Sequence, residues 1–297
     1  MTLLNWYNNT IVLTATLYDD TEESSLRSKA CLDFIQNAFK CNMTVYIVDG
    51  WSKKDFLDRI SIFPNVRLIR YDNNPELQKS HANRRRDGLK RILYESPHIK
   101  YIYWSEPEKS DIVLKSNLDR VINHMIDWSF DQVIPTPKPN DDRPDYMQKI
   151  ELYNTNFITK IAKDWALFFR NISNLEHLYW VPNDETFFDY MFGPKIFTKS
   201  ICERYYLKDK HLKWDGLIIP CMLANFELQN TSSLSINFTY NQYQKWIEES
   251  VEFMSYYKEK RLSQSQLLIE SFLRIYYSEE NDVSYYLNLW KQFLPKI

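Results

Sequence analysis

The stretch SHANRRRDGLKRILYESPHIKYIYWSEPEKSD, residues 80–111, decides the fold that we expect for this chain. The apolar residues of GLKRIL repeat near the 3.6-residue period of a helix, and Pro97 ends this helix because the residue before a proline is disfavoured in the helical region. Residues 99–104, IKYIYW, are rich in β-branched and aromatic side chains, which is typical of an interior strand of a mostly parallel sheet. The stretch is therefore predicted to run as helix, turn and buried strand.

An acidic motif, Glu106-Pro107-Glu108, follows the predicted strand directly. Carboxylates beyond the carboxyl end of a central strand lie where open α/β sheets bind ligands. Two carboxylates on a short loop that contains proline are hard oxygen ligands suited to Mg²⁺ or Mn²⁺, with a phosphate completing the coordination. We therefore expect Glu106 and Glu108 to be metal ligands. The alternative is a solvated acidic turn, the usual role of such a pair.

Three consecutive arginines open the predicted helix. Arg84 and Arg85, in its first turn, are expected to face a phosphate, because the positive end of the helix dipole adds to their charge. Arg86 and Arg91 are expected to face solvent. Trp104, at the end of the strand, is expected either to stack on a base or sugar or to belong to the core.

The composition excludes several classes of protein. With 297 residues, 44% hydrophobic and 26% charged, the chain suits a globular fold with one large core. It has only four glycines and no GxGxxG or GxxxxGK[ST] motif, so we expect neither a dinucleotide site of the Rossmann type nor a P-loop. A formal net charge of −2 gives no general attraction to nucleic acid, and we expect no nucleic-acid partner.

The cysteines and the N-terminus bear on the compartment. The four cysteines form no CxxC pair and no zinc spacing, so we expect buried, reduced thiols. The N-terminal residues do not resemble a signal peptide, and no apolar run reaches the roughly 18 residues of a membrane span. A cytoplasmic protein without an integral membrane segment is the expectation.

Strands and helices alternate through residue 104, which predicts an α/β fold with a mostly parallel sheet. The predicted strands are residues 10–17, 43–48, 66–71 and 99–104, and the helices between them are residues 23–40, 55–60 and the arginine helix. Downstream we expect helices at 114–128, in parts of 145–167 and at 213–225, strands at 132–135 and 234–240, a surface loop at 136–145, and two or three helices within 242–297.

The order of these features resembles the nucleotide-sugar-binding half of GT-A glycosyltransferases, the family-2-like group in particular. Strand, helix, the IVDG of residues 47–50, an arginine-rich helix start and an acidic motif after a fourth strand carry the resemblance. It implies a GT-A fold, with a mostly parallel central sheet flanked by helices. The implied parts are a GT-A-like domain at 9–240, made of a nucleotide-binding half at 9–111 and an acceptor half at 112–240, and a C-terminal helical extension at 241–297.

The resemblance also implies roles for single residues in binding the nucleotide and the metal. Asp49 corresponds to the acidic residue that contacts the nucleoside, and Gly88 belongs to an Arg-x-x-Gly segment near the nucleotide. Glu106 and Glu108 stand where the family commonly has DxD, which holds the divalent metal on the sugar-nucleotide diphosphate. ExE is a departure from that motif, and no Gln-x-x-Arg-Trp motif follows.

The acceptor side is expected to supply a carboxylate. Asp215 lies where such enzymes often place the group that deprotonates the attacking hydroxyl in inverting members, a role worth about 10²–10⁴-fold. Asp215 is equally well placed to be a helix N-cap. Asp184 and Glu185 are the alternative carboxylates.

We therefore expect a glycosyltransferase that moves a hexose from a nucleoside-diphosphate sugar to an acceptor hydroxyl, assisted by Mn²⁺ or Mg²⁺. The alternatives are a nucleotidyltransferase on a similar sheet and a GT-A-like binding module without catalysis. The glycine-rich nucleotide loop of a nucleotidyltransferase is missing after the first strand, where residues 14–18 read TATLY.

Overall fold

A single mixed sheet organises the computed structural model, which describes residues 3–70, 81–137, 143–173, 193–207, 217–228, 230–239, 245, 248–250, 253–277 and 279–293. Within these residues seven strands pair in the order β3-β2-β1-β4-β6-β5-β7. β6 is antiparallel to both of its neighbours, and the other neighbouring pairs are parallel. The strands are β1 (Thr10–Thr16), β2 (Thr44–Asp49), β3 (Val66–Arg70), β4 (Tyr101–Trp104), β5 (Gln132–Pro137), β6 (Lys195–Thr198) and β7 (Thr231–Ile236).

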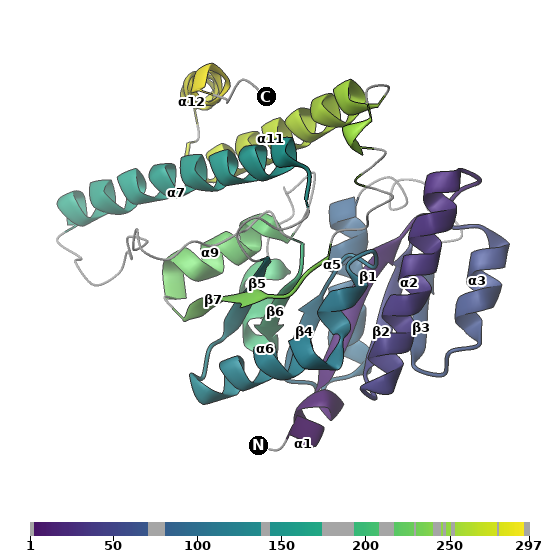
Figure 1. Ribbon diagram of the computed structural model, residues 1–297. Helices are drawn as coiled ribbons and strands as arrows, with labels where there is room; N and C mark the ends of the chain where they lie inside the picture. Colours follow the sequence, from purple (N-terminus) through teal and green to yellow (C-terminus); the bar gives the residue numbers. More distant parts are fainter. Residues whose placement is uncertain are drawn as a thin grey trace.

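Helices cover both faces of the sheet (Figure 1). The helices before β6 are α1 (Leu3–Asn8), α2 (Glu22–Lys40), α3 (Lys54–Ser61), α5 (His81–Glu95), the 3₁₀ turn Ser110–Val113, α6 (Lys115–Asp127) and α7 (Asp145–Ser173). Those after it are α8 (Lys199–Ile201), the π-helical turn Cys202–Tyr206, α9 (Ile218–Leu228), α11 (Met254–Tyr276) and α12 (Glu280–Phe293). Together with the sheet they confirm the predicted α/β class.

The central strands are buried on both faces, which is why their sequences read as nearly continuous apolar runs. In β1, Ile11 and Leu13 belong to a core shared with α5, α9 and α11, whereas Val12 between them belongs to a core shared with α1, α2, α3 and α6. This alternation is the two-residue period of a strand. The helix α2 begins at a cap where the Thr21 hydroxyl accepts a hydrogen bond from the amide of Ser24 at 3.2 Å.

The order of the strands in the sheet reverses beside β1. From β1 the chain moves outward through β2 to β3, and then returns to place β4 on the other side of β1. A point of this kind opens a crevice beyond the carboxyl ends of the strands. The helices α7 and α11 lie across this end of the sheet (Figure 1).

The C-terminal helices α11 and α12 agree with the prediction of two or three helices, and a buried polar network ties them to α7. The amide of Asn154 donates to the hydroxyl of Ser265 at 2.8 Å, and its carbonyl accepts from the indole of Trp290 at 3.0 Å. Asn154 is fully buried, so these bonds fix how the three helices pack.

Several boundaries differ from the prediction. The last strand begins at Thr231 instead of 234 and ends at Ile236, because pairing with β5 selects the polar TSS segment that strand propensity alone disfavours. β5 continues through Pro137 into the predicted loop. Its prolines are tolerated because β6 pairs with β5 only at Gln132 and Val133.

The four cysteines are buried and have free thiols, as predicted. Among the described residues, no helix combines the length and the apolarity that crossing a bilayer requires.

Candidate active site

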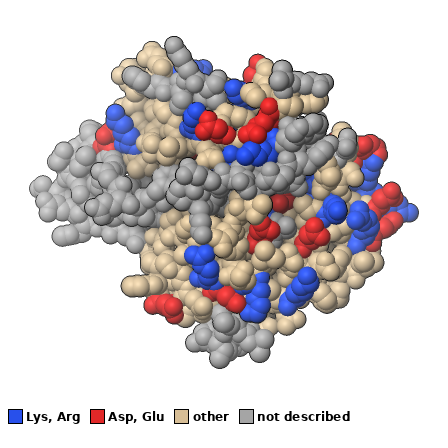
Figure 2. Space-filling view, in the orientation of Figure 1, with Lys and Arg blue, Asp and Glu red and all other residues tan. Residues whose placement is uncertain are grey.

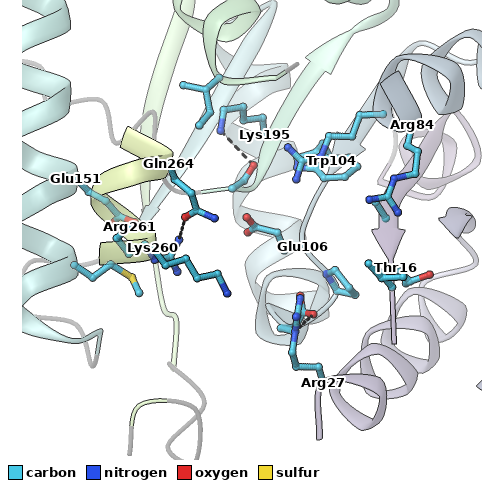
Figure 3. A pocket seen from close by; sticks show the side chains of 18 of the residues that line it. Thr16, Arg27, Arg84, Trp104, Glu106, Glu151, Lys195, Lys260, Arg261 and Gln264 are labelled. Atoms are coloured by element: carbon cyan, nitrogen blue, oxygen red, sulfur yellow. Dashed lines mark hydrogen bonds and ion pairs between the residues drawn. The ribbon is translucent and has the colours of Figure 1, made fainter. Parts of the chain in front are cut away.

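A pocket of about 320 Å³ lies at the carboxyl ends of β1 and β4, beneath α7 and α11 (Figure 3). From the sheet, α2 and α5 come Ala15, Thr16, Leu17, Arg27, Arg84, Arg85, Trp104, Glu106, Pro107, Glu108, Gly193 and Lys195. From the helices above come Met147, Ile150, Glu151, Ile218, Lys260, Arg261, Gln264 and Ser265. The pocket therefore has a sheet wall and a helix wall, and the acidic motif and the arginines of α5 meet on the sheet wall.

Glu106 lies at the centre of the sheet wall. Its carboxylate forms an ion pair with Lys109, one turn further along the loop. Burial opposes ionisation of Glu106, but Lys109, Arg85 and Lys195 outweigh it and hold the pKa of this carboxyl below its usual range. A Cβ atom at Gly193 would overlap the carboxylate, so position 193 has to be glycine for Glu106 to keep this place.

Glu108 points to a different neighbour. Its Oε1 accepts a hydrogen bond from Nε of Arg27 on α2 at 2.7 Å and a longer one from the hydroxyl of Tyr18 at 3.4 Å. The same guanidinium lies 5.9 Å from the centre of the Tyr18 ring. The two glutamates thus line one pocket but form ion pairs with different cations.

These pairings bear on the predicted metal site. Both carboxylates are already neutralised, Glu106 by Lys109 and Glu108 by Arg27. Among the described residues, no three His, Cys, Asp or Glu side chains gather, so a metal would have only these two carboxylates as protein ligands. A divalent ion would have to displace their lysine and arginine partners, so the carboxylates as paired here do not fit Mg²⁺ or Mn²⁺, and the metal roles of Glu106 and Glu108 stay predictions.

The first turns of α5 place two arginines in the pocket. Arg84 is 1% exposed, and its guanidinium packs so closely on Gly50 that a Cβ there would overlap it. Burial lowers the pKa of Arg84, Arg85 lowers it further, and Asp49 opposes the shift. Arg85 lies over the ring of Trp104 at 4.5 Å, a cation–π contact.

Arg86 differs from the prediction that it faces solvent. It is 8% exposed, and its guanidinium donates to the side chain of Asn83 at 2.6 Å. The first turns of α5 are enclosed, and its solvent-exposed face begins only at Lys90 and Arg91.

Asp49 is buried beside the pocket and does not line it. Its carboxylate accepts hydrogen bonds from the hydroxyl of Thr16 at 2.9 Å and from the amides of Trp51 and Ser52 at 2.9–3.1 Å. Asp49 therefore ties the carboxyl ends of β1 and β2 together. Its contact with a nucleoside stays a prediction.

Gly88 is a packing position. A Cβ there would lie 2.6 Å from Val48 and 2.9 Å from Leu13, so glycine lets α5 approach the sheet closely. Its predicted place near the nucleotide stays a prediction. Asp215, Asp184 and Glu185 lie outside the described residues.

Several contributors to the pocket were missed in the sequence, among them Arg27 on α2 and Glu151 on α7. Lys195 is fully buried at the start of β6, opposite Trp104 in register, and its ammonium donates to the carbonyl of Gly193 at 3.2 Å. The signal was a single lysine before the IFT of residues 196–198. A further contributor is α11, whose KEKR run at 258–261 supplies Lys260 and Arg261.

Comparisons with known proteins give distant likenesses to solved structures. No protein-family model matches the sequence, and no curated protein matches it significantly. Residues 1–349 of S. aureus TarS match 92% of this chain and 72% of their own length at 14% identity and a TM-score of 0.45. A longer TarS structure matches 92% of this chain and 44% of its own length at 13% identity and a TM-score of 0.45.

A third solved structure, the 4-diphosphocytidyl-2C-methyl-D-erythritol synthase from Anaerococcus prevotii DSM 20548, matches 78% of this chain and 91% of its own length. Its identity is 13% and its TM-score is 0.41. All three matches have TM-scores below 0.5. They carry no argument about the reaction.

Proposed function

We propose that this protein is a glycosyltransferase that binds a nucleoside-diphosphate sugar in this pocket and transfers the hexose to an acceptor hydroxyl. The observation that carries the proposal is the positive charge of the pocket, which lies where the strand order reverses beside β1. Among the lining residues that the structure describes, six side chains are cationic and three are carboxylates, which leaves an excess of three positive charges. The cations are Arg27, Arg84, Arg85, Lys195, Lys260 and Arg261, and the carboxylates are Glu106, Glu108 and Glu151.

The excess of positive charge is a property of the pocket and not of the whole chain. The whole chain has a formal charge of −2, and on the face in Figure 2 acidic and basic side chains of the described residues are interspersed. A concentration of positive charge inside a concave site raises the local concentration of anions and holds phosphates by charge-assisted bonds. A diphosphate is the anion that this wall suits best, because its charges are spread over several oxygens.

The remaining features suit the rest of a nucleotide sugar. A volume of about 320 Å³ is within the range of small-molecule sites. Trp104, which is 1% exposed and belongs to the core, supports the guanidinium of Arg85 beside the diphosphate. On the helix wall, Glu151 and Gln264 offer polar atoms to an acceptor.

In the proposed reaction, the cations of the sheet wall stabilise the diphosphate as it leaves the sugar. They act where negative charge develops in the transition state, and electrostatic stabilisation of this kind is usually the largest single contribution. Asp215 as the base that takes the proton from the acceptor hydroxyl remains part of the proposal. The hexose, the acceptor and a cytoplasmic location are proposals as well.

The test compares ligands that differ only in their phosphates. Calorimetric titration with UDP, GDP and ADP, and with the matching nucleosides, should show that Arg85→Ala weakens binding of the diphosphate by about 10–100-fold, the loss of one charged hydrogen bond, and leaves nucleoside binding unchanged. Arg91→Ala is the matched control, because Arg91 is on the same helix, exposed and paired with Glu95. Equal losses for both kinds of ligand, or the same loss in the control, would contradict the phosphate role.

Turnover separates the proposal from its alternatives. Incubation with UDP-, GDP- and ADP-sugars should release the nucleoside diphosphate, by transfer or by slow hydrolysis. Release of pyrophosphate from a nucleoside triphosphate would instead identify nucleotidyl transfer. Binding of nucleotide sugars without any turnover would identify a binding module.

A further inference from the structure

We infer that basic side chains take the place of a divalent metal on the diphosphate, and that Glu106 acts as the anion that orients them. The inference rests on the proposed function and names how its site recognises the donor. The cations concerned are Lys109, Arg85 and Lys195, which come from the loop after β4, from α5 and from the start of β6.

The Glu106 carboxylate is paired with one of these cations and lies within the electrostatic influence of the other two. Lys109 forms the ion pair from the same loop. Arg85 is held over Trp104, two residues before Glu106, at 4.5 Å. Lys195, which Figure 3 shows on the same side of the pocket, donates to the carbonyl of Gly193 at 3.2 Å, and a Cβ added at Gly193 would overlap the Glu106 carboxylate.

The local charge equals that of a divalent ion. Among the described residues around Glu106, these three cations and the one carboxylate sum to +2, the charge that Mg²⁺ or Mn²⁺ would bring to a diphosphate. Glu108 adds nothing to this sum, because Arg27 neutralises it. A divalent cation at Glu106 would have to displace Lys109 and would face two further like charges, so a phosphate is the favoured ligand here.

Burial explains why a glutamate occupies the centre of a basic site. Lys195 is fully buried, and a buried ammonium is stable only when an anion and hydrogen-bond acceptors surround it. Glu106 supplies that anion before the donor binds. It is therefore a positioning residue, and the phosphate oxygens share the same cations once the donor is bound.

The test is nucleotide binding with and without metal. In calorimetric titrations, the affinity for UDP and GDP measured in EDTA should equal the affinity measured in Mn²⁺ within about twofold, because the proposed complex contains no metal that EDTA could remove. Lys109→Met should weaken binding in EDTA by about 10–100-fold, and Lys109→Arg should restore most of it, because the charge is kept. Lys115→Met is the matched control, since Lys115 is exposed on α6 and paired with Asp119.

Glu106→Gln gives different expectations for the two mechanisms. If Glu106 orients cations, affinity for the nucleotide falls about 3–10-fold, and by the same factor in EDTA and in Mn²⁺, because a neutral amide holds the cations less firmly than a carboxylate does. If Glu106 binds a metal, the same change lowers affinity in Mn²⁺ at least about tenfold. Circular dichroism and thermal melting of each variant show that it is folded before its affinity is compared.

The outcomes separate the two proposals. Nucleotide binding that requires Mn²⁺ and is lost in Glu106→Gln overturns the metal-free site and leaves the transferase proposal in place. Failure of every nucleotide to bind, with or without metal, overturns both. Metal-independent binding that Lys109→Met weakens and Lys115→Met does not supports the inference.

Discussion

The two walls of the pocket hold their charges in different ways. On the sheet wall Arg84 and Lys195 are 1% and 0% exposed, and glycine backbone lies in contact with Arg84 and Glu106. On the helix wall Lys260 is exposed and Arg261 half-buried on the surface of α11. Buried charges require fixed partners, whereas exposed side chains keep their freedom to move. Under the proposed function, the sheet wall is built in advance for one constant group, the diphosphate, and the helix wall adapts to a variable one.

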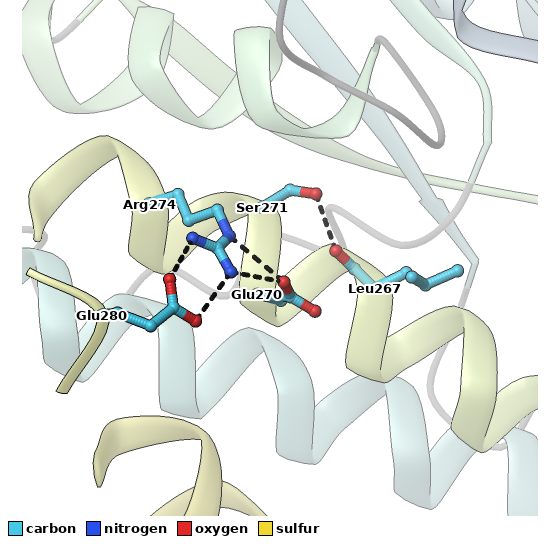
Figure 4. A network of polar contacts seen from close by, with 5 residues as sticks. All are labelled: Leu267, Glu270, Ser271, Arg274 and Glu280. Atoms are coloured by element: carbon cyan, nitrogen blue, oxygen red, sulfur yellow. Dashed lines mark hydrogen bonds and ion pairs between the residues drawn. The ribbon is translucent and has the colours of Figure 1, made fainter. Parts of the chain in front are cut away.

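The walls also differ in how they are held together. The sheet wall is continuous with the core through β1, β4 and α5. The helix wall depends on the network of Asn154, Ser265 and Trp290, and on an exposed cluster in which Arg274 bonds Glu270 and Glu280 at 2.8–3.1 Å (Figure 4).

Replacing one lysine on each wall should give the largest contrast. We expect Lys195→Met to weaken binding of a nucleoside diphosphate by about 100-fold, because a buried charged hydrogen bond is lost. Lys260→Met should cost less than about fivefold, the value of an exposed charge. Isothermal titration with UDP and GDP measures both, with the melting temperature as a check on folding. Similar losses for the two variants would remove the distinction between the walls.

Asn154→Ala tests how the helix wall is fixed. The change leaves the indole N–H of Trp290 buried without its acceptor, which should lower the free energy of unfolding by about 1–3 kcal/mol. Urea denaturation measures this loss. Diphosphate affinity in the folded protein should hardly change, and a large loss would mean that the helix wall also carries the phosphate site.

Gly193→Ala tests the fit of the sheet wall. The added methyl group displaces the Glu106 carboxylate, and we expect about tenfold weaker binding of the diphosphate, the cost of moving one ion pair out of place. Calorimetric titration with UDP and GDP measures this loss.

Gly88→Ala is the companion change in the core, where overpacking against Leu13 and Val48 should cost about 1–3 kcal/mol of stability, measured by urea denaturation. If Gly88→Ala lowered affinity in the folded fraction as well, the predicted contact of Gly88 with the nucleotide would gain support.

Arg274→Ala should have the smallest effect. Its guanidinium is 47% exposed, so the cluster with Glu270 and Glu280 contributes little to stability. The difference in melting temperature between variant and unmodified protein should shrink further in 0.5–1 M salt, where about 3–4 Å of screening length remains. A difference that is independent of salt would show that packing of Arg274, and not its charge, matters.

Much of the sheet wall could be predicted because its signals are local. Three signals lie within 25 residues of sequence, positions 80–104. They are the helical spacing of apolar residues in α5, Pro97 after this helix and the apolar run of β4. Parallel strands end at one edge of a sheet, so Arg84, Arg85, Trp104 and the acidic motif were expected to converge, and they line one pocket.

The missed features depend on contacts distant in sequence. Lys195 reaches the pocket only because β6 is antiparallel, and strand direction is not contained in the residues of one strand. Lys260 lies more than 150 residues after Glu106, and no local pattern indicates that α11 folds back over the pocket. The ion pair of Glu106 and Lys109 is local, only three residues apart, but the sequence does not show whether such a carboxylate binds a metal or pairs with a lysine. The other groups around it in space decide this.

The reversed direction of β6 means that the sheet delivers two kinds of chain segment to the pocket. The pocket residues that follow β1 and β4 come after their strands have left the core, whereas Lys195 comes where β6 enters it. A substitution at Lys195 therefore changes the pocket without altering how β1 and β4 end.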